Sequence, residues 1–421
     1  MLKGEIIIPA DKSISHRSLI FSALSKSKVK IKNLSLGEDC ISTLKILSQL
    51  GVKYEFISDK DLILDSTSGL KSDKLLHLDC GNSGTTTRLM AGVLSGLEVE
   101  AELFGDKSLS SRPMKRIIEP LRLMGANIQS NDNRLPIKIK GQKLKGIEYL
   151  SPVSSAQVKS CIILAGLNAE GITRVYEKDL SRNHTEIMLE YLGANIKTGH
   201  DNKGYFVEIK KSDLKAKDIE IAGDISSASF FMVAASIVPN SDILIKNVGI
   251  NPTRSGILDV FKQAKINFEI LNERVISNEP VSDIRVCYTP NIQPFEIKGD
   301  IIPRLIDEIP ILAILATQAN GTSIVKDASD LRNKESDRIK TISESLTRLN
   351  CKIEEFQDGF TIKGKTLINS DIALETHLDH RLAMSFYVLN LINQKNISIN
   401  GMDCINTSFP EFLQLMKKIS T

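Results

Sequence analysis

One pattern of apolar and polar positions recurs along the chain. An amphipathic helix ends in an apolar residue, a glycine follows, and a short strand with alternating apolar positions comes next. The glycine is Gly51, Gly125 and Gly193 in the three clearest copies, and Lys265 and Asn350 stand in its place in two weaker ones. A residue just after a helix commonly adopts the left-handed conformation, which suits Gly and tolerates Asn. The pattern therefore predicts five units of helix, cap and strand.

The steps between these five positions are 74, 68, 72 and 85 residues. They are too long for a solenoid repeat, but they suit a unit of about seventy residues that stacks on its copies to bury its apolar face. A sixth helix, 409–419, has no strand after it, and the first strand, Glu5–Pro9, has no helix before it. We infer that this strand completes the last repeat, which places both ends of the chain in one domain.

Helices alternating with short strands predict an α/β fold, and a chain of 421 residues is expected to form two or three domains. The inferred pairing of the two ends makes the chain cross between the domains twice, near Pro9–Asp11 and near Ile221–Asp224. The expected N-terminal domain is 12–221, and the expected C-terminal domain is 1–11 with 222–421. Two adjacent crossings make a hinge, and ligands often bind in a cleft beside a hinge.

Composition narrows the class of protein. The chain has 421 residues, of which 42% are hydrophobic and 25% are charged, and its net charge is +3. These are the proportions of a soluble globular protein, and the small charge argues against a general nucleic-acid binder. No signal peptide and no apolar run of membrane-spanning length is present in the sequence. We therefore expect a cytoplasmic protein whose partners are small molecules, not nucleic acid or membrane.

The six cysteines are scattered, without paired spacing or a nearby histidine cluster. Neither a zinc site nor a disulfide framework is indicated, and reduced, buried thiols are the simplest interpretation. We expect no metal and no cofactor.

The most informative stretch is Asp11–Arg17, where the first strand gives way to a helix. It places Lys12, Ser13 and Arg17 beside the unpaired N–H groups and positive dipole end of that helix, where an anion is stabilised. The alternative is ordinary helix capping by Ser13 or Ser15, with a solvated Lys and Arg.

Five further segments begin a predicted helix in the same way. They are 80–88, 154–159, 181–186, 223–228 and 332–338. Helix capping explains any one of these segments. Together with Asp11–Arg17 there are six in one chain, and capping alone is a weaker explanation for all of them. If packing of the repeats aims these helix starts at one cleft, their dipoles favour a multiply charged anion.

Four other residues carry candidate chemistry. Arg112 precedes a proline, which favours an extended backbone, and Arg381 begins a predicted helix. Each arginine has a surface salt bridge as its alternative role. Asp307 and Glu308 form an acidic pair in apolar sequence, where burial could raise a pKa and permit proton transfer. Capping of the helix Ile311–Ala316 is an equally good interpretation of that pair.

Together these segments resemble a known family. The motifs that carry the resemblance are Asp11-Lys12-Ser13-x-Ser15-x-Arg17, Gly81-Asn82-Ser83-Gly84-Thr85, Leu109-x-x-Arg112-Pro113-Met114, Arg332-x-Lys334-Glu335-Ser336-Asp337-Arg338 and Asp379-His380-Arg381-x-Ala383-Met384. They are similar to those of the 5-enolpyruvylshikimate-3-phosphate synthase (3-phosphoshikimate 1-carboxyvinyltransferase) family. Matching motifs run from Lys12 to Pro410, nearly the whole chain.

The resemblance implies two domains, each built from three βαβαββ repeats as an inside-out α/β barrel, that are joined by a double-crossover hinge and close on the substrates. It implies transfer of the enolpyruvyl group of phosphoenolpyruvate to the 5-hydroxyl of shikimate 3-phosphate, with release of phosphate. The intermediate would be a tetrahedral adduct not bound covalently to the protein. This reaction belongs to the shikimate pathway of aromatic amino acid biosynthesis. A monomer is implied, with no metal or cofactor.

The resemblance also implies roles for individual residues. Shikimate 3-phosphate would be bound by Lys12, Ser13, Arg17, Ser154, Ser155, Gln157, Ser181, Arg182, Asp307 and Lys334. Phosphoenolpyruvate would be bound by Lys12, Asn82, Gly84, Arg112, Gln157, Arg338 and Arg381. The catalytic residues would be Asp307 as the base at the 5-hydroxyl, Glu335 in proton transfer, and Lys12.

One position departs from the family pattern. A lysine common in the family just before the Ser408-Phe409-Pro410 segment is replaced, and Thr407 stands there beside Asn406. One expected cation of the phosphoenolpyruvate site is therefore unassigned.

Two other functions compete with this assignment. One is the sister enolpyruvyl transferase that acts on UDP-N-acetylglucosamine, which uses a cysteine in the loop before its Arg-Pro pair. Here that loop, Lys107–Arg112, has no cysteine. The other is a non-catalytic anion-binding or RNA-processing relative, which the low net charge and the pair Asp307 and Glu335 disfavour.

Overall fold

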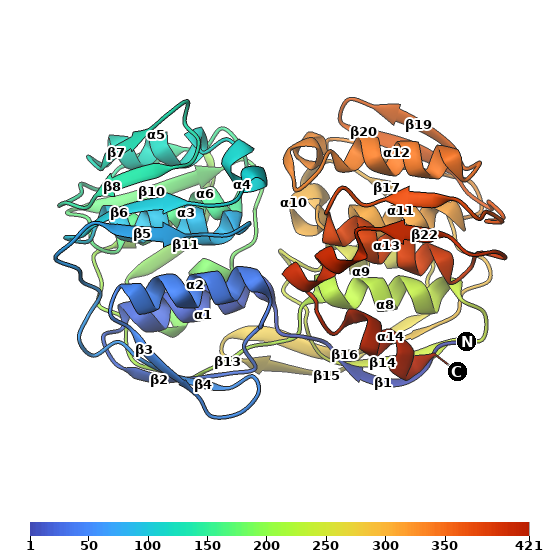
Figure 1. Ribbon diagram of the computed structural model, residues 1–421, viewed down its shortest axis with the longest axis horizontal. Coiled ribbons are helices and arrows are strands. Elements are labelled where there is room, and N and C mark those ends of the chain that lie inside the picture. Colours follow the sequence, from blue (N-terminus) through green and yellow to red (C-terminus); the bar gives the residue numbers. More distant parts are fainter. Residues whose placement is uncertain (421) are drawn as a thin grey trace. The chain divides into compact units, whose positions relative to one another are not determined.

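The chain divides into two compact units, which we call the N-terminal and the C-terminal unit (Figure 1). The computed structural model describes residues 1–420. The N-terminal unit is 10–221 with 276–279, and the C-terminal unit is 1–9, 222–275 and the chain from 280 onward. Breaks at Pro9/Ala10 and at Ile221/Ala222 match the two expected crossings. The units differ from the expected domains at 10–11 and at 276–279, which cluster with the N-terminal unit.

The N-terminal unit contains twelve strands and seven helices among the described residues. Its strands are β2 (Lys28–Lys32), β3 (Lys53–Phe56), β4 (Leu62–Asp65), β5 (Leu76–Asp79), β6 (Glu100–Phe104), β7 (Asn127–Ser130), β8 (Ile137–Lys140), β9 (Glu148–Leu150), β10 (Ile172–Glu177), β11 (Ile196–Asp201), β12 (Gly204–Lys210) and β13 (Ile219–Glu220). Its helices are α1 (Lys12–Leu24), α2 (Glu38–Gln49), α3 (Gly84–Ser95), α4 (Lys107–Ser111), α5 (Lys115–Leu123), α6 (Ala156–Gly166) and α7 (His184–Tyr191).

These strands form three four-stranded sheets with one common topology. The orders are β13-β2-β4-β3, β5-β6-β8-β7 and β9-β10-β12-β11. In each sheet the first pair is parallel and the other two pairs are antiparallel. In two of the sheets a helix joins the strands of the parallel pair, α3 between β5 and β6 and α6 between β9 and β10, as a βαβ connection requires. In the third sheet β13 pairs with β2 from the other end of the unit, so the three sheets share one topology but not one connection.

The C-terminal unit repeats this plan twice and then shortens it. Its strands are β1 (Lys3–Ile7), β14 (Asp242–Gly249), β15 (Phe268–Ile276), β16 (Glu279–Cys287), β17 (Glu296–Ile297), β18 (Thr322–Val325), β19 (Lys352–Phe356), β20 (Gly359–Lys363), β21 (Ala373–Glu375) and β22 (Ser398–Asn400). Its α-helices are α8 (Ile225–Ile237), α9 (Gly256–Gln263), α10 (Ile302–Leu305), α11 (Ile309–Thr317), α12 (Arg338–Arg348), α13 (His380–Asn390) and α14 (Phe412–Ile419). The 3-10 helices are η1 (Gly299–Ile301), η2 (Ser329–Asn333) and η3 (Met402–Thr407). The sheets are β1-β14-β16-β15, β17-β18-β20-β19 and the two-stranded β21-β22.

In both units helices lie inside and sheets lie outside. All nine residues of α11 are buried, and so are twelve of the thirteen residues of α8, with no polar face on either helix. In Figure 1, α8, α11 and α13 run alongside one another, and these three helices pack together. The strands alternate instead: in β8, Ile137 and Ile139 are buried while Lys138 and Lys140 are exposed. The period of burial thus assigns helices to the core and sheets to its cover.

All five predicted helix caps are left-handed. Gly51, Gly125 and Gly193 have φ of 96°, 93° and 79°, and Lys265 and Asn350 have φ of 53° and 61°. The prediction of helix, cap and strand is confirmed at each position, including the lysine.

The first strand has a different partner from the one inferred. β1 pairs in parallel with β14, from Lys3 opposite Asp242 to Ile7 opposite Lys246. It therefore completes the sheet of β14, β16 and β15, and the inference that it completes the last repeat was wrong. Leu2 and Ser420 form a single antiparallel bridge, so the end of α14 does reach the first residues of the chain. The sequence pattern identified the neighbours but not the hydrogen-bonded sheet.

Two further features bear on class. All six cysteines are free thiols, four of them buried, and burial raises the pKa of Cys161 to about 12. Among residues 1–420, no helix has both the length and the apolar character needed to cross a bilayer.

Candidate functional site

The site residues of the N-terminal unit begin at the start of α1. Asp11 is the helix cap and its carboxylate accepts a hydrogen bond from the N–H of Ile14 at 2.8 Å, so capping by Ser13 or Ser15 was wrong. Lys12 is the first residue of the helix, and its Nζ lies 3.0 Å from Asp39 of α2, with 20% of the side chain exposed. A carboxylate thus holds this lysine at the helix start.

Arg17 is anchored one turn further along α1. Its Nε donates to Thr185 Oγ1 at 2.7 Å, its Nη2 to Ser160 Oγ at 2.8 Å, and its Nη1 to the carbonyl of Ser13 at 2.9 Å. The side chain is buried, and burial lowers the pKa of Arg17 to about 10, still well above neutral pH. This arginine brings α1, α6 and α7 together and supplies a fixed positive charge.

A second group surrounds the start of α3. Asn82 accepts a hydrogen bond from Arg112 Nη2 at 2.7 Å and donates one to Asp106 at 2.7 Å. Arg112 has an extended backbone, as expected before proline. A Cβ on Gly84 would lie 2.6 Å from Nη1 of Arg88 and 3.5 Å from Nη1 of Arg112. The absence of a side chain at Gly84 therefore leaves room for two guanidinium groups.

The start of α6 joins this group. Gln157 accepts a hydrogen bond from Arg88 Nη1 at 2.7 Å and donates one to Thr85 Oγ1 at 3.0 Å. The side chain of Gln157 therefore ties α6 to the first turn of α3. The resemblance did not include Arg88 in the site, although this arginine lies in one of the helix-start segments.

Ser154, Ser155, Ser181 and Arg182 lie on two neighbouring loops of the same unit. The hydroxyl of Ser154 accepts a hydrogen bond from the N–H of Asp179 at 3.0 Å. The N–H of Ser155 donates to Glu177 at 2.9 Å, and the hydroxyl of Ser181 donates to both oxygens of Glu177, at 2.7 and 2.8 Å. Glu177 therefore links the two loops.

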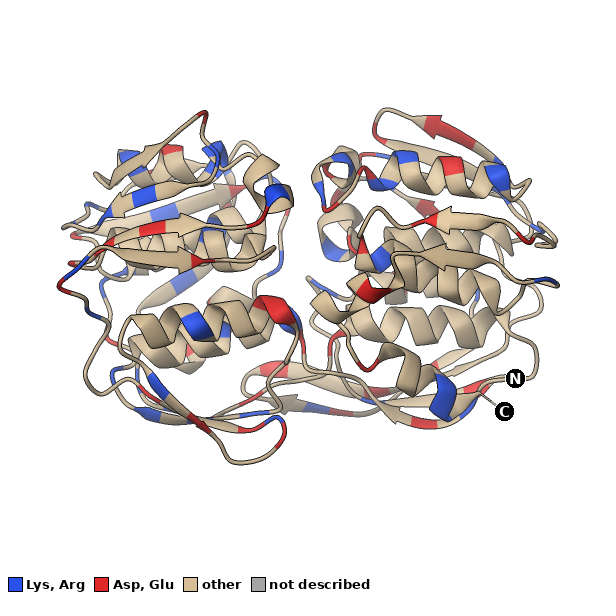
Figure 2. Ribbon diagram, viewed as in Figure 1, with Lys and Arg blue, Asp and Glu red and all other residues tan. Residues whose placement is uncertain are grey.

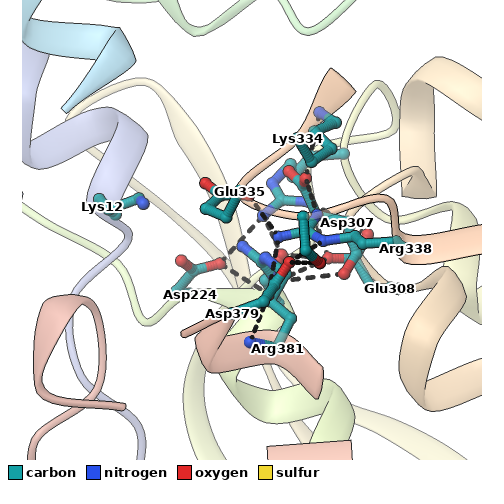
Figure 3. Close-up of polar contacts among 12 residues, drawn as sticks. Lys12, Asp224, Asp307, Glu308, Lys334, Glu335, Arg338, Asp379 and Arg381 are labelled. Atoms are coloured by element: carbon teal, nitrogen blue, oxygen red, sulfur yellow. Dashed lines mark hydrogen bonds and ion pairs between the residues drawn. The ribbon is translucent and has the colours of Figure 1, made fainter. Parts of the chain in front are cut away.

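The candidate residues of the C-terminal unit form one cluster of charges (Figure 3). Asp307 lies 3.5 Å from Lys334 Nζ and 3.5 Å from Arg338 Nη1. Glu335 lies 2.7 Å from Nη2 of the same arginine. Asp307 and Glu335 are 15% and 23% exposed, so both carboxyl groups are partly accessible.

Arg338 is held rigidly at the centre of this cluster. Its side chain is 1% exposed, and its Nε and Nη2 donate to the fully buried carboxylate of Asp379 at 2.8 and 3.2 Å. Burial opposes its charge, but Asp379 and Glu335 outweigh that effect and raise the pKa of Arg338 above the ordinary value. Its Nη1 has the longer ion-pair contact with Asp307 and no hydrogen bond within residues 1–420. Arg381, on α13, donates to the backbone carbonyl of Asp307 at 3.2 Å.

The two residues of the acidic pair have different roles. Glu308 is fully buried, takes two contacts of 3.0 and 3.1 Å from Arg254 Nη1, and occupies the cap position of α11 without capping it by its side chain. Asp307 lies beside Lys334 and Arg338, whereas the carboxylate of Glu308 lies 4.0 Å from Nη1 of Arg381 (Figure 3). Helix capping, one of the two interpretations left open, was wrong for the side chain of Glu308.

The structure thus gathers each unit's candidates into connected clusters. Charge is balanced within them, and Figure 2 shows Lys and Arg interspersed with Asp and Glu in each unit. Sequence reasoning gave no role to the carboxylates that hold the cations and polar groups: Asp39, Asp106, Glu177 and Asp379. Asp379 is part of a quoted motif and Asp106 lies shortly before another, whereas nothing near Glu177 in the sequence signals its contacts.

Repeat-built α/β units with cations fixed at helix starts, and with carboxylates paired to cations, define a class of proteins that bind multiply charged small anions and have groups suited to proton transfer. Comparisons with known proteins narrow this class. The model of the family described as EPSP synthase (3-phosphoshikimate 1-carboxyvinyltransferase) matches residues 1–416.

Relatives of the chain agree with that match. It is 45% identical to the 3-phosphoshikimate 1-carboxyvinyltransferase of Oceanobacillus iheyensis, over 99% of this chain and 97% of that one. It is 44% identical to the protein of the same name from Staphylococcus carnosus, over 100% and 96%. The solved structure of EPSP synthase from Acinetobacter baumannii has a TM-score of 0.88 and 39% identity, and covers 100% of this chain and 96% of that one.

The chain therefore belongs to the EPSP synthase (3-phosphoshikimate 1-carboxyvinyltransferase) family. It is an enzyme of aromatic amino acid biosynthesis with the two-domain α/β fold of that family. The resemblance noted in the sequence is confirmed.

Proposed function

We propose that this chain transfers the enolpyruvyl group of phosphoenolpyruvate to the 5-hydroxyl of shikimate 3-phosphate and releases inorganic phosphate. The family match and the names of full-length relatives support the reaction. The observation that carries the chemistry is the carboxylate of Asp307 at 3.5 Å from both Lys334 and Arg338, with Glu335 on the same arginine.

The N-terminal unit is proposed as the shikimate 3-phosphate side. Lys12, Ser13 and Arg17 would bind the substrate from the start of α1. Ser154, Ser155, Gln157, Ser181 and Arg182 would bind it from the two loops and the start of α6, and Asp307 and Lys334 are the ligands proposed from the C-terminal unit. The burial of Arg17 among hydroxyl partners supports a permanent positive charge for a phosphate dianion.

Phosphoenolpyruvate carries a phosphate and a carboxylate, and arginines bind both groups through paired N–H donors. We assign Lys12, Asn82, Gly84, Arg112, Gln157, Arg338 and Arg381 to this substrate. The anchoring of Arg338 by Asp379 supports the assignment, because a guanidinium already fixed in place loses little entropy on binding.

The proposed chemistry divides between two carboxyl groups. Asp307 accepts the proton of the 5-hydroxyl as its oxygen attacks C2 of phosphoenolpyruvate, and Glu335 in its protonated form gives a proton to C3. The product of this step is a tetrahedral adduct. The C2–O bond to phosphate then breaks, one proton passes from C3 back to Glu335, and the enol ether forms. The departing phosphate takes the proton held by Asp307, so both carboxyl groups return to their starting states and atoms and protons balance. Lys12 and Arg338 stabilise the charge that moves onto the departing phosphate.

The family match does not establish the oligomeric state, the cellular location or the need for a cofactor. We propose that the protein is a monomer in the cytoplasm, works on small molecules without nucleic acid, and needs no metal or cofactor. The proposed charge stabilisation uses side chains alone.

Phosphate release from phosphoenolpyruvate tests the function. We expect release with shikimate 3-phosphate and none with UDP-N-acetylglucosamine. Activity with the nucleotide sugar alone would assign the chain to the sister reaction, and release without an acceptor would make it a phosphatase.

A further inference from the structure

We propose that Glu177, held in place by the buried Lys159, is a positioning residue that fixes the two loops expected to bind shikimate 3-phosphate. This inference rests on the proposed function, and every contact behind it lies within the N-terminal unit. No motif of the resemblance includes either residue among the ligands.

Glu177 ends β10 and is 2% exposed. Its carboxylate accepts from the N–H of Ser155 at 2.9 Å, from the hydroxyl of Ser181 at 2.7 and 2.8 Å, and from the N–H of Ser181 at 3.4 Å. One carboxylate therefore sets the backbone on both sides, at the residue that caps α6 and at the loop before α7.

Lys159 supports this carboxylate from α6. Its side chain is 1% exposed, and its Nζ lies 2.8 Å from Glu177 and 2.8 Å from Glu186, which is 5% exposed. Two carboxylates that share one buried ammonium would repel each other without it, and one would then take up a proton. Burial opposes the charge of Lys159, but the two glutamates outweigh that effect and raise its pKa above the ordinary value.

The single hydroxyl proton of Ser181 limits which group this side chain can bind as a donor. A serine hydroxyl has a single proton, and here it is donated to Glu177. An ionised glutamate and a phosphate cannot both accept that proton. The hydroxyl of Ser181, assigned above as a direct ligand, then acts instead as a link to Glu177, and its effect on the substrate passes through the shape of the loop.

The same cluster reaches the proposed phosphate ligand Arg17. Glu186 is the strongest favourable charge on that arginine, and Arg17 is hydrogen-bonded to Ser160, the residue after Lys159. Ion pairs buried this deeply are costly to break by removing one partner, because the other charge is left without compensation. Such a cluster is a rigid support for loops that must bind a dianion.

The first test uses the ligand-free protein and Glu177→Gln. Gln keeps the size of the side chain, but its amide places a donor where four donors now converge. We expect amide exchange at Ser155 and Ser181 to become at least tenfold faster. Glu148→Gln is the control, because Glu148 lies in the same sheet and makes only an exposed ion pair with Lys203. Unchanged exchange at both amides in Glu177→Gln would overturn the proposal.

The second test is kinetic. In Glu177→Gln the KM for shikimate 3-phosphate should rise at least tenfold, while kcat changes less than threefold and the KM for phosphoenolpyruvate less than twofold. A KM within twofold of wild type, or equal losses for both substrates, would overturn the proposal. If the wild type itself shows no turnover, the proposed function fails, and the exchange measurement still decides the role of Glu177.

The third test asks whether Ser181 acts through Glu177 or contacts the substrate directly. Its single variant, Ser181→Ala, also tests the proposal if Glu177→Gln does not fold. Ser181→Ala keeps the ion cluster, so we expect it to fold and to raise exchange across 178–184. The double variant combines Glu177→Gln with Ser181→Ala. If Ser181 acts through Glu177, its KM for shikimate 3-phosphate equals that of Glu177→Gln alone. Multiplied effects in the double variant would mean that Ser181 contacts the substrate independently of Glu177. Unchanged exchange in Ser181→Ala would mean that its hydroxyl does not fix the loop, and either result would overturn the proposal.

Discussion

His16 lies between two of the proposed ligands on α1 and is fully buried. Its Nδ1 lies 2.7 Å from Thr43 Oγ1, which in turn lies 2.7 Å from Thr86 Oγ1. Burial, with smaller contributions from the charges of Lys12 and Arg17, lowers the pKa of His16 well below 6.5. The imidazole is therefore neutral in the folded protein at neutral pH.

This lowered pKa predicts a loss of stability in acid. Below about pH 6.5 the unfolded chain binds a proton at His16 that the folded chain does not bind, so the free energy of unfolding falls as pH falls. The slope approaches about 1.4 kcal/mol per pH unit for one such group. We expect His16→Gln to lose less melting temperature than wild type between pH 7 and pH 5, by calorimetry.

His77→Gln is the matched control, because the side chain of His77 is 61% exposed on β5. It should show the wild-type decrease. Equal decreases in wild type and His16→Gln would mean that His16 does not titrate differently in the two states.

For individual residues, the sequence predicts which side chains carry charge in the site but not which partners bind them. Arg338 and Asp379 are both motif residues, and their pairing spans 41 positions. Arg17 is hydrogen-bonded to Thr185, in the helix-start segment 181–186, across 168 positions. Such contacts depend on how repeats stack, and no local pattern encodes them. The capping role of Asp11 could have been predicted, since an aspartate directly before a helix is a strong N-cap signal.

Helices α3 and α6 show how elements set the site. The two helices pack closely, and a Cβ on Gly92 would lie 2.2 Å from the backbone carbonyl oxygen of Cys161. The absence of that Cβ lets the helices approach, and their first turns then meet through the hydrogen bonds of Gln157 to Arg88 and Thr85.

Gly92→Ala should force these two helices apart. Overpacking of this kind costs about 1–3 kcal/mol, so we expect a lower melting temperature together with a higher KM for phosphoenolpyruvate. Gly96→Ala is the control, because its Cβ would lie 3.3 Å from the Cβ of Asn168 and 3.8 Å from the carbonyl oxygen of Ala165, without the severe backbone clash of Gly92. Equal effects of the two substitutions on melting temperature and KM would mean that the close contact of α3 with α6 does not position the site.

Elements were the part of the fold most open to sequence reasoning. The helix, cap and strand pattern predicted all five left-handed caps, because apolar period and cap chemistry are local. The partner of β1 was not predictable in the same way. Any strand of suitable alternation could pair with it, and only the stacking of whole repeats selects β14.

At the scale of the whole molecule, Lys12 and Glu335 have separate proposed roles, because Lys12 binds both substrates and Glu335 only transfers a proton. Lys12 begins the first helix of one unit, and Glu335 lies beside Arg338 in the other. Lys12→Ala should therefore lower the affinity for both substrates and the turnover. Glu335→Ala should mainly lower kcat, by about 100-fold or more, as expected for a general acid.

Steady-state kinetics with each substrate varied in turn measures this division. Glu344→Ala is the control for Glu335, since Glu344 lies on α12 with 59% of its side chain exposed. Wild-type kcat in Glu335→Ala would exclude that carboxyl group from proton transfer.

The central claim is that the reaction breaks the carbon–oxygen bond of phosphoenolpyruvate and transfers carbon, not phosphorus. Phosphoenolpyruvate labelled with oxygen-18 in the bridge between C2 and phosphorus tests it most directly, with the released phosphate analysed by mass spectrometry. Attack of the 5-hydroxyl at C2 predicts that all of the label leaves in the phosphate. Label retained in the three-carbon fragment would mean attack at phosphorus, and would contradict the account.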